Sequence, residues 1–205
     1  MKTALFGGTF DPVHNGHLAL AREVLACGAA ERVIFMPAPN PPHKTDRRIT
    51  PFPIRWEMLT LALDGEEGME LSDAEKYRSG RSYTIDTLNQ VSKFYPDDDI
   101  LLLIGSDSLR QLHTWRQPRE LVARFGIISY PRNGETVSRG ELLRHWSEPE
   151  ADLLLRTVLT SVPRFPVSST EIRELFRTGR WKDAELFLSP AVANYIEKNK
   201  VYEKT

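Results

Sequence analysis

Short apolar runs alternate along this chain with segments that have the periodicity of amphipathic helices, and this alternation is the strongest constraint on its fold. Residues 100–104 form an uninterrupted apolar run, which is typical of a strand buried on both faces of a parallel sheet. Strands that alternate with helices form βα units with right-handed crossovers. We therefore predict an α/β fold with a doubly wound parallel sheet, in a single domain of residues 1–205 with a helical C-terminal end.

The boundaries of these elements follow from the same pattern. Strands are expected at residues 3–6, 32–36, 69–72, 100–104, 126–130 and 158–161. Helices are expected at residues 16–27, 53–63, 84–94, 118–125, 169–178 and 190–198. Residues 37–53 hold six of the 14 prolines, and a loop this long is uncommon unless it binds or covers a ligand. Residues 132–150 are polar and carry no strong pattern, so no element is predicted there.

The charge balance argues against a general nucleic-acid-binding protein. Lys and Arg number 27 and Asp and Glu number 28, which gives a formal net charge of −1, whereas nucleic-acid-binding domains usually have a basic excess. The apolar runs are far shorter than the roughly 20 residues of a membrane-spanning helix. The one cysteine, Cys27, has no intramolecular disulfide partner and is expected to be a small packing residue. These features fit a cytoplasmic protein with neither a nucleic-acid nor a membrane partner.

The segment from Gly7 to His17 follows the first expected strand and opens the first expected helix. In an open α/β sheet, ligands bind beyond the carboxyl ends of the strands. Gly7 and Gly8 would let backbone amides approach a phosphate, and the helix start would offer free N–H groups. His14 and His17 are three residues apart, so we expect them to share one helix face and to bind an anionic phosphate. No third ligand is close in the sequence, so no metal site is predicted.

A second polar segment, residues 168–173, lies far along the chain. Its simplest interpretation is a helix start that Ser169 or Thr170 caps. A functional interpretation adds that the hydroxyl groups and Arg173 bind a polyphosphate, because a guanidinium offers a fixed fork of donors. The two interpretations are compatible. The functional one requires the two distant segments to fold together into one cradle for a triphosphate.

The two segments resemble the paired signatures of the nucleotidyltransferase superfamily with the His-x-Gly-His motif, which has a Rossmann-like fold. The first reads Gly-Gly-Thr-Phe-Asp-Pro-Val-His-Asn-Gly-His and the second Ser-Ser-Thr-Glu-Ile-Arg. Within this superfamily the chain resembles bacterial nicotinate-nucleotide adenylyltransferases over residues 4–202. Further matching segments, in the family's order, lie at residues 41–44, 82–84 with 87–88, 104–109, 114–115 and 131–132.

The resemblance implies two neighbouring substrate sites. The residues implied to bind ATP are Gly7, Gly8, Thr9, Phe10, His14, His17, Gly105, Asp107, Ser168, Ser169, Thr170 and Arg173. Those implied to bind nicotinate mononucleotide are Lys44, Tyr83, Thr84, Trp115 and Arg132. Trp115 would stack on the nicotinate ring, Tyr83 and Thr84 would lie near its carboxylate, and the two cations would bind the phosphate. The structural alternatives are a helix cap for Asp107, a core position for Trp115 and solvated side chains for Lys44 and Arg132.

The implied reaction moves AMP from ATP to nicotinate mononucleotide and releases pyrophosphate, in NAD biosynthesis. A substrate phosphate is ionised near neutral pH, so catalysis would depend on positioning and on charge stabilisation by His14, His17 and Arg173. Mg²⁺ is expected to arrive with ATP, the proline-rich loop is expected to close over the mononucleotide, and homo-oligomerisation is left open. One alternative is a transferase of the same superfamily that acts on phosphopantetheine or an alcohol phosphate, and another is a non-catalytic nucleotide sensor.

Overall fold

A computed structural model of the protein describes residues 1–39, 49–76, 83–132, 134–156, 158–160, 162 and 165–203. Its centre is a parallel sheet of five strands in the order β3-β2-β1-β4-β5. The strands are β1 (Lys2–Gly8), β2 (Arg32–Pro37), β3 (Met69–Leu71), β4 (Asp99–Gly105) and β5 (Gly126–Tyr130). The chain moves outward from β1 to β3 and then resumes at β4 on the other side of β1. The predicted α/β, doubly wound sheet is therefore confirmed.

Five of the helical elements were not expected from the sequence. The helices are α1 (Asn15–Ala26), α2 (Phe52–Leu63), α3 (Thr84–Phe94), α4 (Ser106–Gln111), α5 (Pro118–Arg124), α6 (Arg139–Leu142), α7 (Glu148–Leu155), α8 (Ser169–Arg177), α9 (Trp181–Glu185) and α10 (Pro190–Lys198), with the 3-10 helix η1 (Leu112–Thr114). The sequence did not reveal α4, η1, α6 and α9, because helices of six residues or fewer present too few apolar positions for a periodicity. It also did not reveal α7, which begins inside the polar segment 132–150. Within the described residues 158–160, Val158 makes one isolated bridge to Ser129 and the expected strand is absent.

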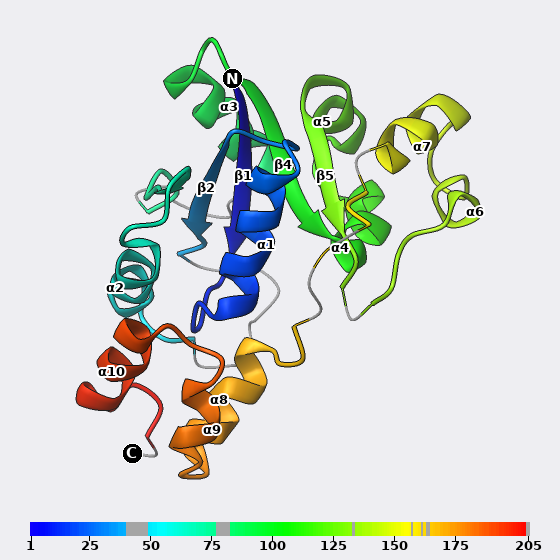
Figure 1. The fold of residues 1–205 in the computed structure, drawn as a ribbon. Helices are drawn as coiled ribbons and strands as arrows, with labels where there is room; N and C mark the ends of the chain where they lie inside the picture. The colour runs from blue at the N-terminus through cyan, green and yellow to red at the C-terminus, as the bar shows by residue number, and fades with distance from the viewer. Residues whose placement is uncertain are drawn as a thin grey trace.

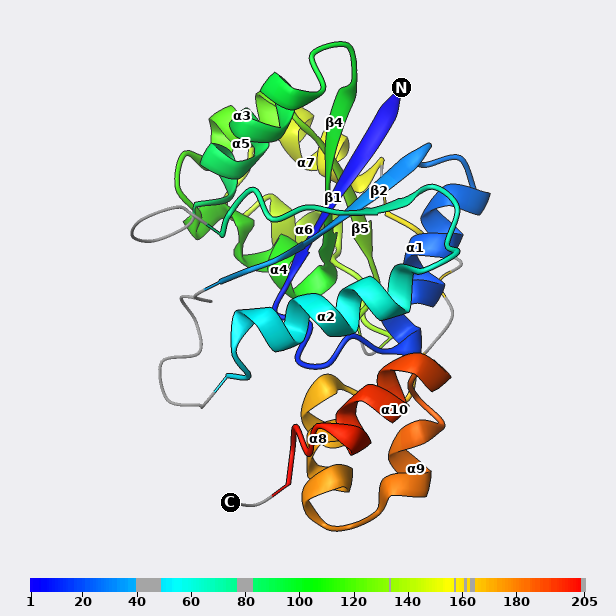
Figure 2. The same ribbon diagram turned by 90° about the vertical axis from the view of Figure 1, so that its left-hand side faces the viewer.

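The sheet separates two hydrophobic cores. Successive side chains of a strand point to opposite faces, so Ala4 and Phe6 of β1 enter one core whereas Leu5 enters the other. The first core packs under α1, α2, α8 and α10, and the second under α3, α5 and α7 (Figures 1 and 2). This double coverage explains the uninterrupted apolar run of β4, because Leu103 faces one core and Leu102 the other.

The C-terminal helices cover the carboxyl end of the sheet. Both views show α8, α9 and α10 grouped beyond the end toward which β1 points (Figures 1 and 2). The strand order reverses between β1 and β4, which is where open α/β sheets bind ligands. The architecture therefore places a candidate site between these two strand ends, with α8 nearby.

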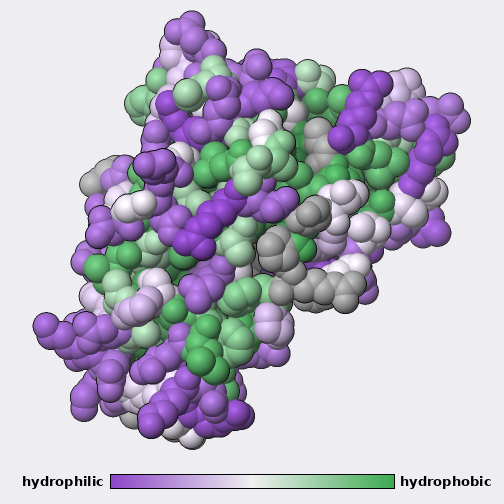
Figure 3. All heavy atoms as spheres, viewed as in Figure 1, coloured by the Kyte–Doolittle hydropathy of each residue, from purple (hydrophilic) through white to green (hydrophobic). Residues whose placement is uncertain are grey.

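The position of Cys27 differs from the one predicted from the sequence. Cys27 is exposed, because α1 ends at Ala26 and Cys27 is the residue that caps it; its assignment as a packing residue was wrong. On the face shown in Figure 3, hydrophilic residues make up most of the outer edge, and hydrophobic residues gather in patches that lie mainly in the middle of the face. Within the described ranges, no helix combines the length and the apolar character needed to cross a bilayer.

Candidate active site

Two histidines cap the start of α1 with their own side chains. His14 is the N-cap residue, and its Nδ1 accepts a hydrogen bond from the Gly16 N–H at 3.2 Å. His17 is the third residue of the helix, and its Nδ1 accepts from the His14 N–H at 3.2 Å. A ring nitrogen that accepts a hydrogen bond carries no proton, so each neutral ring carries its proton on Nε2. His14 thus precedes the helix instead of lying on its face, but the two ring centres are still only 3.8 Å apart.

The environment keeps both histidines neutral near pH 7. Burial lowers the pKa of His14 from 6.5 to about 4, with a smaller contribution from the positive charge of Arg132. The pKa of His17 is also lowered, to well below 6.5. Burial is the largest cause, and the positive charges of His14 and then of Arg132 lower it further. A bound polyphosphate would act in the opposite direction, because a nearby negative charge favours the imidazolium. The pair is therefore a set of neutral N–H donors that can gain charge when an anion binds.

The ring of Phe10 supports His17 from within the core. Phe10 is 2% exposed and has a positive φ of 47°, and its ring lies edge-on to that of His17 at 5.1 Å. A Cβ atom at Gly8 would come within 2.9 Å of the Phe10 ring. Gly8 is therefore required by packing as well as by any close approach of a phosphate. Phe10, which was expected to contact the nucleotide, lies beneath this loop.

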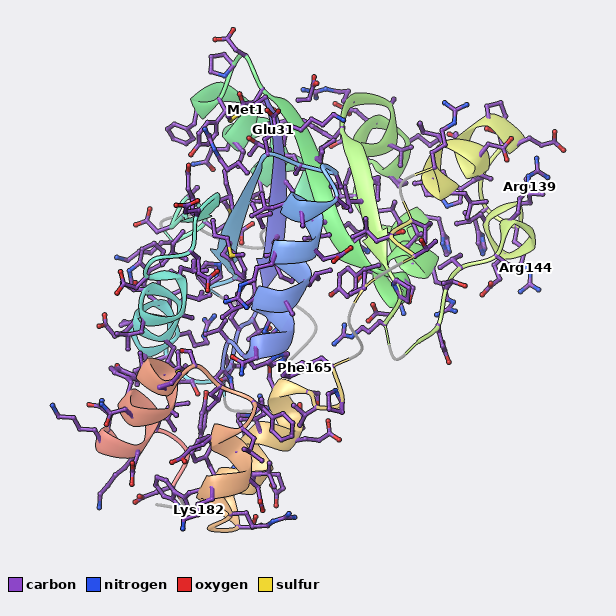
Figure 4. All side chains as sticks on the ribbon, viewed as in Figure 1. Met1, Glu31, Arg139, Arg144, Phe165 and Lys182 are labelled. Carbon is purple, nitrogen blue, oxygen red and sulfur yellow. The ribbon has the colours of Figure 1, made fainter. Side chains whose placement is uncertain are left out.

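A second aromatic ring explains Gly16. A Cβ atom at Gly16 would lie 2.5 Å from the ring of Phe165, which stacks on the His14 ring at 5.1 Å. Figure 4 labels Phe165 beside the start of α1, just before the chain enters α8. The histidine pair is thus held between rings from two distant parts of the chain.

The two segments that the sequence analysis paired lie side by side. The Arg173 guanidinium donates to the backbone oxygen of Asp11, and its second nitrogen donates to Thr170 Oγ1 at 3.1 Å. The Ser169 hydroxyl donates to the backbone oxygen of Pro12 at 3.0 Å. Arg173 is only 8% exposed, and two of its guanidinium nitrogens already donate to these protein acceptors. The predicted juxtaposition of the two segments is confirmed. Arg173, which was expected to bind a polyphosphate, connects the two segments through its hydrogen bonds.

The residue that caps α8 differs from the one predicted. The Ser168 hydroxyl accepts from the Glu171 N–H at 3.3 Å, and the Glu171 carboxylate accepts from the Ser168 N–H at 2.7 Å. These bonds form a reciprocal capping box. Ser168 is therefore the cap, and the assignment to Ser169 or Thr170 was wrong. Hydrogen bonds to Ser168 also lower the pKa of Glu171.

A buried polar network, which no sequence pattern indicated, lies beneath the first loop. Arg55 is fully buried, and its guanidinium donates to the backbone oxygens of Thr9 at 2.7 Å and Thr50 at 2.8 Å. The Tyr202 hydroxyl donates to a carboxylate oxygen of Asp11 at 2.8 Å. Asp11 lies inside the first motif, but no local pattern signals its partners. Arg55 lies within the helix expected at residues 53–63, and nothing in the sequence pattern marked it as a buried residue.

A cavity of about 540 Å³ opens at the carboxyl ends of β1 and β4. The predicted site residues in its lining are Gly7, Gly8, Thr9, Tyr83, Thr84, Gly105, Trp115 and Arg132. Its lining also includes Thr87, which lies in one of the segments that match the family, and Glu75 and Arg116, which no sequence pattern singled out. The histidine pair, Asp107 and the start of α8 are not part of the lining. Lys44 lies outside the described residues, as do residues 40–48 of the proline-rich loop.

Asp107 and Arg132 form an ion pair at the rim of this cavity. Their side chains are 48% and 55% exposed, and the closest nitrogen and oxygen atoms are 2.7 Å apart. An exposed pair of this kind contributes only about 0–1 kcal/mol, so a ligand can replace it at little cost. Gly105 is the N-cap residue of α4, and a Cβ atom there would lie 2.6 Å from the Asp107 carboxylate.

A ligand cavity at the reversal of strand order, with paired histidines at the first helix, indicates a nucleotidyltransferase, and the family model described as cytidylyltransferase-like matches residues 5–175. The chain is 37% identical over 202 residues to the nicotinate-nucleotide adenylyltransferase of Bacillus subtilis, with 98% of each chain covered. It is 34% identical over 201 residues to a Clostridium tetani protein described as a probable nicotinate-nucleotide adenylyltransferase, again with 98% coverage of each. The chain belongs to the nicotinate-nucleotide adenylyltransferase family.

The fold is also that of a solved structure with low sequence identity to this chain. The structure of Plasmodium falciparum nicotinic acid mononucleotide adenylyltransferase complexed with NaAD matches with a TM-score of 0.77. The match covers 98% of both chains at 19% sequence identity. The sheet and its flanking helices are thus retained where little sequence is shared.

Proposed function

We propose that this chain transfers the AMP moiety of ATP to nicotinate mononucleotide, giving nicotinate adenine dinucleotide and pyrophosphate in NAD biosynthesis. The observation that supports this most strongly is the capped histidine pair, because both rings direct a fixed Nε2–H away from the helix start. The pair follows Gly7–Thr9, which line the cavity, and the contact between Arg173 and Asp11 holds α8 against it. Membership in the family supports the same substrates.

The proposed reaction is an in-line displacement. A 5′-phosphate oxygen of nicotinate mononucleotide attacks the α-phosphorus of ATP, and the new P–O bond forms as the bond to the pyrophosphate breaks. The attacking oxygen is already ionised near neutral pH, so the chain needs no general base. His17, with His14 assisting, donates to the oxygens of the α-phosphoryl group as their charge changes. The Arg173 guanidinium places a positive charge beside the departing pyrophosphate while it holds the loop at Asp11.

The two substrates would share the cavity. ATP would meet Gly8 and Thr9 at the end of β1, and the mononucleotide would meet Trp115 and the start of α3. Mg²⁺ would enter this scheme with the ATP substrate, where it would neutralise part of the phosphate charge and require few protein ligands. In the part of the chain that the structure describes, no three His, Cys, Asp or Glu side chains are grouped to hold a metal ion. We further propose that the reaction takes place in the cytoplasm.

Pyrophosphate release with MgATP and either the acid or the amide mononucleotide tests this function. His17→Ala should lower kcat by at least about 100-fold, which is typical for the loss of one charge-stabilising donor. His17→Gln should lose activity as well but keep the helix start intact, because Gln suits the third position of a capping box. His145→Ala, at an exposed position outside the site, is the matched control and should remain active.

Two results would contradict the proposal. Near-normal turnover by both His17 variants would show that this side chain has no catalytic role. A wild-type protein that binds ATP but releases no pyrophosphate with either mononucleotide would favour a nucleotide sensor.

A further inference from the structure

The cavity is lined by two described arginines that differ in their partners. Arg132 is paired with Asp107 at 2.7 Å. Arg116 follows Trp115 directly, and its guanidinium carbon lies 4.5 Å from the centre of the Tyr83 ring. Among the described residues, no carboxylate lies within ion-pair distance of Arg116. Arg116 is therefore a cavity cation that an aromatic face holds in place and that no described anion neutralises.

Among the described residues that line the same cavity, the one carboxylate is that of Glu75. Glu75 accepts a hydrogen bond from the Thr87 hydroxyl, and Thr87 lies in the first turn of α3 with its backbone N–H bonded to the Tyr83 carbonyl at 3.2 Å. Glu75 thus lies at the N-terminal end of α3. This is the end at which free backbone N–H groups could donate hydrogen bonds to a substrate carboxylate. A second negative charge placed there is repelled by Glu75. An acidic ligand in this cavity needs a positive charge to offset that repulsion.

We propose that Arg116 is a specificity-determining residue, whose guanidinium pairs with the ring carboxylate of nicotinate mononucleotide and so favours the acid over the amide. This inference rests on the proposed function and extends it to the choice of substrate. A guanidinium presents parallel N–H donors that match both oxygens of a carboxylate. The amide has one oxygen and an NH₂ group whose hydrogens would face those donors, and it carries no charge. Trp115 would then contact the face of the nicotinate ring, and the adjacent Arg116 would bind the carboxylate that the ring carries.

The test compares kcat/KM for nicotinate mononucleotide and nicotinamide mononucleotide. Arg116→Gln should lower the value for the acid by at least about tenfold, as expected for the loss of one charge-assisted pair, and should leave the value for the amide nearly unchanged. Glu75→Gln should raise the preference for the acid, because it removes the competing carboxylate. Arg119→Gln is the control, since Arg119 is exposed, pairs with Glu150 and is absent from the cavity lining.

A second readout does not depend on turnover. Calorimetric titration of each mononucleotide into the wild type and Arg116→Gln should show the same loss for the acid alone. Added salt should weaken the acid preference of the wild type more than that of the variant, because salt screens exposed charges.

Three outcomes would overturn the inference. An equal loss for acid and amide would place Arg116 at the phosphate or ribose that the two share, or in a packing role. An unchanged ratio in Arg116→Gln would show that other groups choose the substrate. If the wild type released no pyrophosphate with either mononucleotide, the proposed function would fail and the inference would fail with it.

Discussion

His14 should make the stability of this protein depend on pH between neutrality and mild acid. Burial lowers the pKa of His14 from 6.5 to about 4. Below about pH 6.5 the unfolded chain binds a proton at this side chain, whereas the folded protein does not bind it until about pH 4. The unfolded state therefore binds more protons within this window, so the free energy of unfolding falls as the pH falls. At about 1.4 kcal/mol per pH unit, the full effect is about 3 kcal/mol, of which about 2 kcal/mol is lost between about pH 7.5 and about pH 5.

The variant His14→Asn isolates this contribution from that of the carboxylates. Asn is a favoured N-cap residue, so its side-chain oxygen can replace Nδ1 as the acceptor for the Gly16 N–H, but it does not titrate. Urea unfolding of both proteins at the two pH values gives the comparison. The wild type should lose about 2 kcal/mol more than the variant on going from the higher to the lower pH. If both proteins lose the same free energy, burial does not hold His14 neutral and the reasoning is refuted.

Three further substitutions test packing and binding. Tyr202→Phe removes the hydroxyl that donates to buried Asp11 at 2.8 Å, and the free energy of unfolding in urea should fall by about 1–3 kcal/mol; no change would mean that the carboxylate finds another donor. Gly16→Ala adds a Cβ atom 2.5 Å from an aromatic ring and should lower the melting temperature, although Ala favours helices. Gly140→Ala is the control, because nothing lies within 4 Å of the added Cβ atom, and it should not lower the melting temperature. Trp115→Ala should raise KM for the mononucleotide much more than KM for ATP, and equal increases would indicate a packing role.

The elements that the sequence predicted best are those whose burial pattern repeats over enough residues to be recognised. The run in β4 is apolar because both faces of the sheet are covered, and α1 and α3 are long enough for their buried positions to recur at helical spacing. Residues 132–150 were not assigned because α6 has only four residues. The capping box at Ser138 was the one local signal of its start. Cys27 was misplaced for a related reason, because one residue at a helix end decides between burial and exposure.

The sequence by itself determined the α/β class, the five strands of the sheet, the histidine pair at the start of α1 and the family, because each of these is encoded in neighbouring residues. Only the tertiary structure decided which acceptors the charged side chains take. It placed Arg173 on the Asp11 backbone, buried Arg55 beneath the first loop and left Arg116 beside Tyr83 with no described carboxylate to pair with. Hydrogen bonds and ion pairs depend on distances of a few ångströms between residues far apart in the chain, and no local pattern specifies those distances.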